Sequence, residues 1–113
     1  MYMTVGTMRF VLTLEDNPTS RAFVQLLPAT FEMTDLNGNE KKVTLPRSLP
    51  TKSVRPGTIR TGDVLLYGND TLVVFYKTFQ SDYSYTSIGR IAQSAGLAEA
   101  LGPDNQRVVF EIP

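Results

Sequence analysis

Apolar and polar residues alternate along much of this chain with the period of two that is typical of half-buried β-strands. The pattern is clear in residues 8–15, where Phe10, Leu12 and Leu14 share one face. Residues 1–5 predict a preceding strand. A hairpin at Gly6-Thr7 would join the two, because glycine accepts the positive φ of a tight turn.

Further hairpins follow along the chain. Asn37-Gly38 is a strong hairpin signal and lies between predicted strands at residues 30–36 and 40–45. A second turn, at residues 68–70, separates strands predicted at 63–67 and 71–77. The run from Leu72 to Tyr76 is apolar on both faces, which predicts a central strand covered on both sides. The remaining strands are expected at residues 87–92 and around Val108, Phe110 and Ile112, whose side chains would point inward.

Two short helices interrupt the strands. Asn17 is a favoured N-cap and Pro18 fits the first helical position, so a helix is expected to begin there and to end at Pro28. A second helix is predicted after Ser94 as its N-cap, and it would end at Gly102-Pro103.

The long irregular segment at residues 46–61 has two readings. It contains three prolines, the last of them in a Pro-Gly turn signal, and it carries Arg47, Arg55 and Arg60. It is either a surface crossover between two halves of a barrel or a binding loop. The element count, about eight short strands and two helices, predicts a mainly β protein. We expect one domain over residues 1–113, folded as a closed or nearly closed β-barrel.

Composition narrows the chemistry. The 113 residues carry 11 basic and 11 acidic side chains, so no net charge attracts nucleic acid, and we expect no nucleic-acid partner. Cysteine, histidine and tryptophan are absent. Without cysteine and histidine there is no cysteine nucleophile, no histidine relay and no ordinary zinc or haem site, so no metal and no cofactor are expected.

The location of the protein is an expectation from what the sequence lacks. No apolar run approaches the length of a membrane helix, and no charged region followed by an apolar run marks a signal peptide. We therefore expect a cytoplasmic protein without membrane insertion. The alternative is a protein of the cell envelope, or a secreted one, whose leader has been removed.

The order of elements resembles the cyclophilin fold. The resemblance is carried by the segments TLEDNPTSRAFVQLLP, DLNGNEKKVTLP, GTIRTGDVLLYGNDTLVVFYKTF and YSYTSIGRI. More narrowly, these segments are similar to a bacterial family of small cyclophilin-like proteins. It covers nearly the whole chain and is most specific at residues 14–18, 35–40 and 62–79. The resemblance implies a cyclophilin-like β-barrel.

The resemblance also implies a test for prolyl isomerase activity. Cyclophilins that isomerise prolyl bonds use an arginine beside a strand, a glutamine and phenylalanines on an inner strand, and a tryptophan and a histidine at the rim. Here the matching inner strand, residues 71–76, has no glutamine, and tryptophan and histidine are missing. Lys41 and Lys42 stand where the arginine strand corresponds best, and lysine replaces a guanidinium poorly. We therefore expect no catalytic residues of the isomerase type.

Aromatic and basic residues are the candidate ligand-binding set. Tyrosines combine a large apolar face with a hydroxyl, which suits recognition of a peptide or a flat ligand. Loop aromatics also plug barrel ends, and Tyr67, just before a turn, either caps the core or faces a cleft. Loop arginines are mostly solvated, but two that fold over the barrel mouth would clamp a carboxylate or phosphate. The candidates are Tyr67, Phe75, Tyr76, Phe79, Tyr83, Tyr85, Arg47, Arg60 and Arg90.

Three hypotheses about function follow, in order of preference. The first is a non-catalytic module that binds a peptide or small molecule in a barrel cleft. The second is an accessory subunit whose aromatic patch is a protein interface. The third is a weak, divergent prolyl isomerase, which would be favoured if Arg47 or Arg60 lay beside Phe75.

Overall fold

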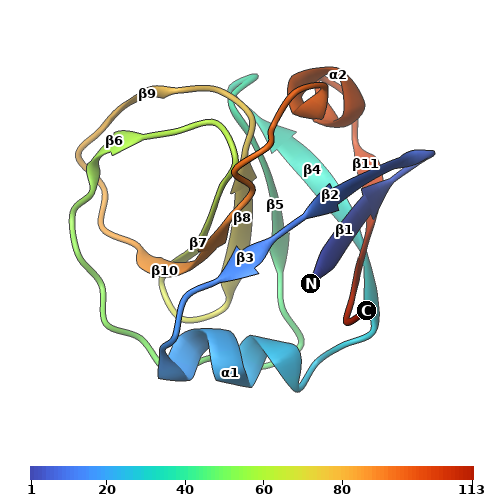
Figure 1. Cartoon of the computed structure of the whole chain (residues 1–113). Helices are drawn as coiled ribbons and strands as arrows, with labels where there is room; N and C mark the ends of the chain where they lie inside the picture. The colour runs from blue at the N-terminus through green and yellow to red at the C-terminus, as the bar shows by residue number, and fades with distance from the viewer.

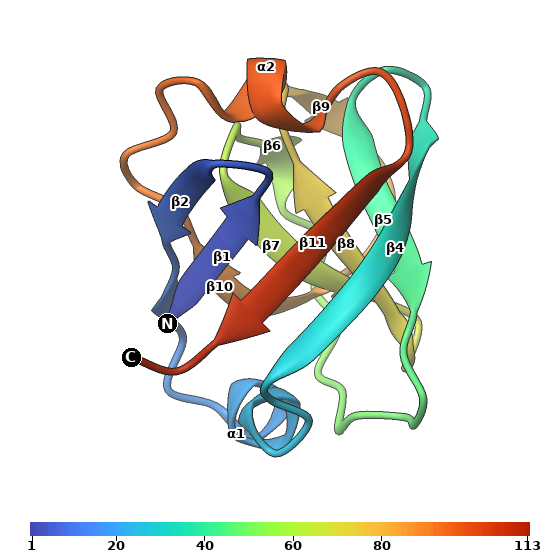
Figure 2. The same ribbon diagram turned by 90° about the vertical axis from the view of Figure 1, so that its right-hand side faces the viewer.

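The computed structural model describes residues 1–113 as a β-barrel with a short helix at each end (Figures 1 and 2). The barrel wall is a nine-stranded sheet of order β2-β1-β11-β4-β5-β8-β7-β10-β3, and β6 pairs with β9 in a separate two-stranded sheet. The predicted mainly β fold with two short helices is confirmed. The elements are β1 (Tyr2–Val5), β2 (Met8–Val11), β3 (Thr13–Leu14), α1 (Pro18–Val24), β4 (Ala29–Leu36), β5 (Glu40–Thr44), β6 (Gly57–Ile59), β7 (Asp63–Tyr67), β8 (Thr71–Phe75), β9 (Phe79–Ser81), β10 (Thr86–Arg90), α2 (Leu97–Leu101) and β11 (Gln106–Glu111).

One stretch of chain closes the barrel. The sequence predicts a single strand over residues 8–15, but the structure divides it at Leu12 into β2 and β3. β2 pairs with β1 at one edge of the sheet and β3 pairs with β10 at the other. The Leu12 N–H donates to the carbonyl of Met1 at 2.8 Å. The division arises because this stretch changes its partner strand, which an alternating pattern does not reveal.

Apolar side chains fill the inside of the barrel and a smaller patch outside it. The inner cluster contains 19 buried residues, among them Phe23 from α1, whose ring meets Phe110 edge-on at 5.5 Å between centroids. Leu72 and Val74 of β8 point into this cluster. A second cluster of five buried residues lies on the other face of β7 and β8. The central strand is therefore covered on both sides, as its sequence predicts.

The predicted N-cap residue is correct for the first helix and wrong for the second. Asn17 caps α1, its Oδ1 accepting the Ser20 N–H at 2.8 Å. The helix ends at Val24 rather than just before Pro28. Beyond Val24 the backbone N–H groups of residues 25–27 donate to carbonyls three residues earlier, as in a 3₁₀-helix. Ser94 as a cap for α2 is wrong, since the helix starts after Gly96 in the left-handed conformation with no side-chain cap. Neither helix is long and apolar enough to cross a membrane.

The long segment at residues 46–61 is more ordered than its composition indicates. It contains β6, which pairs with β9 across the outer face of the barrel, and a bridge between Val54 and Tyr85. Three-residue strands are too short to show an alternating pattern, so both were missed. Ile112 was also placed wrongly, since it lies beyond the end of β11 and is 52% exposed.

Candidate functional site

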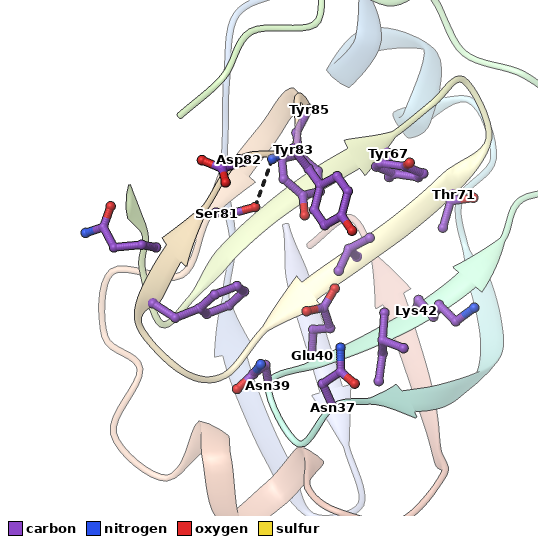
Figure 3. Close-up of a pocket in the computed structure, with 14 residues that line it drawn as sticks. Asn37, Asn39, Glu40, Lys42, Tyr67, Thr71, Ser81, Asp82, Tyr83 and Tyr85 are labelled. Carbon is purple, nitrogen blue, oxygen red and sulfur yellow. Dashed lines mark hydrogen bonds between the residues drawn. The ribbon is translucent and has the colours of Figure 1, made fainter. Parts of the chain in front are cut away.

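A cleft of about 790 Å³ opens on the outer face of the barrel wall (Figure 3). Its floor is built by β5, β8 and β7, and its sides are the β4–β5 turn and residues 79–85. The pleat decides which side chains reach it. On β5, Glu40 and Lys42 line the cleft while the intervening Lys41 is buried on the barrel side, and on β8 Val73 lines it while Leu72 and Val74 fill the core.

Tyrosines form the aromatic side of the cleft. Tyr67 packs against Tyr83 and Tyr85 with centroids 6.0 and 5.8 Å apart. Tyr85 also meets Phe75 edge-on at 5.6 Å and is buried, so it belongs to the second apolar cluster. Tyr67 and Tyr83 are different, because they are 47% and 64% exposed. Tyr85 therefore packs against the barrel wall as a structural residue. Tyr67 and Tyr83 leave ring surface exposed that a ligand could contact.

Polar side chains form the opposite side. Asn37, Asn39, Glu40 and Lys42 come from the β4–β5 hairpin and line the cleft. The hairpin has the predicted tight turn, with Asn37 and Gly38 both at positive φ (58° and 65°). Figure 3 shows the Glu40 carboxylate pointing into the space between the hairpin and the tyrosines.

Glu40 is the unusual member of this set. The residue is only 7% exposed, yet its carboxylate makes no hydrogen bond and no ion pair within the protein. Burial raises the pKa of Glu40, and the negative charge of Asp35 raises it further, while the positive charge of Lys42 lowers it. The Glu40 oxygens still reach the solvent of the cleft, because Thr4 Oγ1 is the one fully buried side-chain polar atom without a partner. The partial loss of solvent around the carboxylate carries a cost in folding free energy.

An ion pair between a buried lysine and a partly exposed aspartate holds the hairpin from the side away from the cleft. The Lys41 ammonium donates to Asp35 Oδ1 at 2.7 Å, and the Tyr76 hydroxyl donates to the same oxygen. The Gly38 N–H donates to Asp35 Oδ2 at 3.0 Å. Because Gly38 is the turn residue, this network fixes the turn that presents Glu40 to the cleft.

The Tyr85 hydroxyl is a neutral donor over the physiological pH range. Burial raises the pKa of Tyr85, a hydrogen bond from Ser81 opposes that shift, and the negative charge of Glu40 adds to it. Tyrosine normally ionises near pH 10, so a raised pKa keeps this hydroxyl protonated. Tyr85 therefore contributes an uncharged hydroxyl to the aromatic side of the cleft.

Replacing Glu40 with glutamine is expected to stabilise the protein by at most about 1 kcal/mol at neutral pH, because a partly desolvated charge without a partner in the protein is removed. A raised native pKa means that the native state holds its proton more tightly than the unfolded state. The cost of Glu40 is therefore absent below its ordinary pKa of 4.5 and appears as pH rises through the raised value. Urea unfolding of both proteins at several pH values tests this. A gain that persists unchanged below pH 4.5, or a loss at neutral pH, would contradict it.

The structure brings together only part of the predicted binding set. Tyr67, Phe79, Tyr83 and Tyr85 line the cleft. Phe75 lies beneath them, fully buried, as the floor under Tyr85 and Phe79.

The other predicted members lie elsewhere. Tyr76 points to the opposite face, where its ring packs in the barrel core. Arg47, Arg60 and Arg90 are exposed and do not line the cleft; the Arg90 Nε lies 4.0 Å from Asp63 Oδ1.

Sequence reasoning missed the polar side of the cleft. Glu40 and Lys42 share a pleat face with Val73 in the neighbouring strand, and this follows only from the register, which pairs Lys42 with Val73. Asp82 also lines the cleft. The usable signal was the alternation in residues 40–44, which places two charged side chains on a face adjoining a buried strand.

Comparison with known proteins agrees with this architecture. No curated protein sequence and no solved structure gives a significant match to the chain. A family model described as the cyclophilin-like family matches residues 3–112, nearly the entire barrel. With the closed sheet, the end helices and the outer cleft already in view, this match shows that the chain belongs to the cyclophilin-like family.

Proposed function

We propose that this protein is a non-catalytic binding module whose ligand, a peptide or small molecule, occupies the cleft over β5, β8 and β7. The observation that carries the proposal is the pair of exposed tyrosines, Tyr67 and Tyr83, facing a polar hairpin across a cleft of about 790 Å³. That volume falls within the usual range for ligand sites, and an apolar wall with a few convergent polar groups is their usual lining.

The tyrosines suit binding for an energetic reason. A tyrosine offers large contact area with few rotatable bonds, so little side-chain entropy is lost when a ligand covers it. Tyr83 is additionally held by its backbone N–H, which donates to the Ser81 hydroxyl at 3.2 Å. The ring surface is thus partly preorganised before any ligand arrives.

We propose binding rather than prolyl isomerisation because the cleft is lined by a lysine and not by an arginine. The resemblance to isomerases implies an arginine beside the aromatic floor, and neither Arg47 nor Arg60 is among the residues that line the cleft. Lys42 is the basic residue there. A lysine cannot hold a carbonyl with the two parallel N–H groups that a guanidinium offers.

Tyr83→Ala is expected to weaken ligand binding by about tenfold or more, as truncation of an aromatic anchor does. Stability should change little, because the side chain is mostly exposed. The assay is a titration with short blocked peptides, followed through the ring signals of Tyr67, Tyr83 and Tyr85 by NMR. Tyr2→Ala is the matched control, since that tyrosine lies outside the cleft under the Arg9 guanidinium.

The same samples test the isomerase alternative. Uncatalysed prolyl isomerisation takes tens of seconds or longer, so catalysis of an Xaa-Pro peptide would appear as new cis–trans exchange peaks. Exchange that disappears in Arg47→Ala or Arg60→Ala would overturn the proposal in favour of an enzyme. If none of a varied set of peptides and amines shifts the NMR signals of the cleft tyrosines, the proposal that the cleft binds such ligands is wrong.

A second candidate, a protein interface, is favoured by one observation. Val54 is exposed and is bridged through its backbone to Tyr85, so an apolar side chain from the long segment adjoins the tyrosine side of the cleft. A partner would then cover Tyr83 and Val54 together. Val54→Asp would abolish such an interaction and leave the binding of short peptides in the cleft intact.

A further inference from the structure

Nothing within the protein pairs with the Glu40 carboxylate, although the residue is mostly shielded from solvent. It is more than nine-tenths buried, it points into the cleft, and it has no hydrogen-bond or ion-pair partner (Figure 3). The neighbouring carboxylate, Asp35, differs in every respect, since it accepts from Lys41, Tyr76 and the Gly38 N–H. The Glu40 carboxylate is shielded by the protein on most sides and opens to solvent in the cleft, so it is placed to pair with a group that the ligand supplies.

The surroundings favour a positively charged partner. Among the residues that line the cleft, Glu40 and Asp82 are acidic and only Lys42 is basic. The opposite side is made of tyrosine rings, whose negative π-faces attract cations. Side-chain carbonyl oxygens of Asn37 and Asn39 are available as further acceptors on the hairpin.

We propose that the cleft recognises a cationic group of its ligand, an alkylammonium or a guanidinium, with Glu40 as the counter-charge and Tyr67 and Tyr83 covering the hydrocarbon stem. This inference rests on the proposed binding function and specifies its ligand chemistry. The same chemistry is offered by a free organic amine and by a lysine or arginine side chain of a peptide.

Other ligand classes fit these residues less well. An anion would enter next to two carboxylates with one lysine to hold it. A metal ion needs several acidic, histidine or cysteine ligands, and no group of three such residues is placed to hold one. A neutral apolar ligand would bury Glu40 further and leave its charge unmatched.

Lys42 sets a second expectation. It lies two residues after Glu40 on the same face of β5, and its charge acts on that carboxylate, although no contact within 4.0 Å joins them. A cationic ligand therefore competes with Lys42 for Glu40. Removing the lysine charge should strengthen the binding of cations and weaken that of anions.

The experiment compares two blocked tripeptides that differ in one atom group, and a third tripeptide with glutamate at its centre tests for anion binding. One has lysine between two alanines, and the other has norleucine, which keeps the hydrocarbon stem and lacks the ammonium. Calorimetry and tyrosine NMR signals report binding to the whole protein. The lysine peptide is expected to bind about tenfold more tightly than the norleucine peptide, the scale for a hydrogen bond to a charged group.

Variants assign that preference to Glu40. Glu40→Gln should reduce the preference to about twofold or less, and Lys42→Gln should increase it. Glu99→Gln on the exposed face of α2 is the matched control, because it removes one carboxylate outside the cleft and should leave the preference unchanged. Circular dichroism of each variant checks that it is folded.

The outcomes separate this inference from the proposed function. If both peptides shift the tyrosine signals equally, the cleft binds ligands but does not select a cation, and this inference is wrong while binding stands. If a glutamate-centred peptide binds best and Lys42→Gln abolishes it, the cleft is an anion site. If no peptide binds but n-butylamine does so with the Glu40 dependence, the cationic ligand is a free amine.

Discussion

Asp35→Asn is expected to lower the free energy of unfolding by about 3–5 kcal/mol, because it leaves a buried lysine without its counter-charge. Lys41 is 0% exposed and its ammonium lies 2.7 Å from Asp35 Oδ1. The Tyr76 hydroxyl would lose an ionised acceptor at the same time. Urea unfolding, monitored by circular dichroism at neutral pH, measures the loss.

A second variant separates the charge from the packing. Lys41→Met keeps an unbranched chain in the core and leaves Asp35, whose side chain is 19% exposed, with Tyr76 and the Gly38 N–H as donors. Its cost should therefore be clearly smaller than that of Asp35→Asn. The double variant should recover most of the stability lost in Asp35→Asn, because methionine at position 41 leaves no unpaired charge in the core. Equal losses for both single variants would contradict a buried charge as the cause.

The pH dependence of this pair has the opposite sign to that of Glu40. Burial raises the pKa of Asp35, but hydrogen bonds from Lys41, Tyr76 and Gly38 together with the lysine charge outweigh it, and the pKa is lowered. The stabilisation by Asp35 is hence complete above its ordinary pKa and is lost as pH falls through the lowered value. The two carboxylates of this hairpin therefore have different roles. Asp35 stabilises the turn, whereas Glu40 lowers the stability of the fold and faces the cleft.

Much of the fold was predictable because the signals are local. Asn17-Pro18 fixes the start of a helix through one side-chain acceptor and one missing N–H. Asn37-Gly38 fixes a turn because both residues tolerate positive φ. The central strand follows from residues 72–76, which are apolar on both faces. Each of these conclusions needs only neighbouring residues.

The cleft was less predictable because it depends on register and on long-range packing. Glu40 becomes a cleft residue only through the pairing of β5 with β8, more than 30 residues along the chain. β6 and β9 are too short to be recognised individually, and they pair only because the barrel wall supports them. The arginines were candidates on charge alone, and charge does not tell where a loop side chain points.

Phe75→Ala is expected to reduce stability by about 3–5 kcal/mol, the usual cost of truncating a buried phenylalanine, and to disorganise the cleft. Phe75 is fully buried in the second apolar cluster, and its ring contacts Tyr85 and Phe79 at centroid distances of 5.6 and 5.8 Å. That cluster has only five buried residues, so few side chains remain to fill the space. Tyr85 would lose the support that sets the position of Tyr67. Unfolding by urea gives the stability, and tyrosine ring signals give the state of the cleft.

Phe23→Ala is the matched control, because Phe23 is equally buried but lies in the inner cluster, against Phe110. Both variants remove the same atoms, and the structure places only one of them under the tyrosines. The Phe23 variant should lose comparable stability while its folded fraction keeps native signals for Tyr67, Tyr83 and Tyr85. Native signals in Phe75→Ala as well would mean that the β6–β9 sheet holds the tyrosines without the aromatic floor. A change in both variants would mean that the two apolar clusters form one cooperative unit across the barrel wall, and the cleft could not then be altered independently of the core.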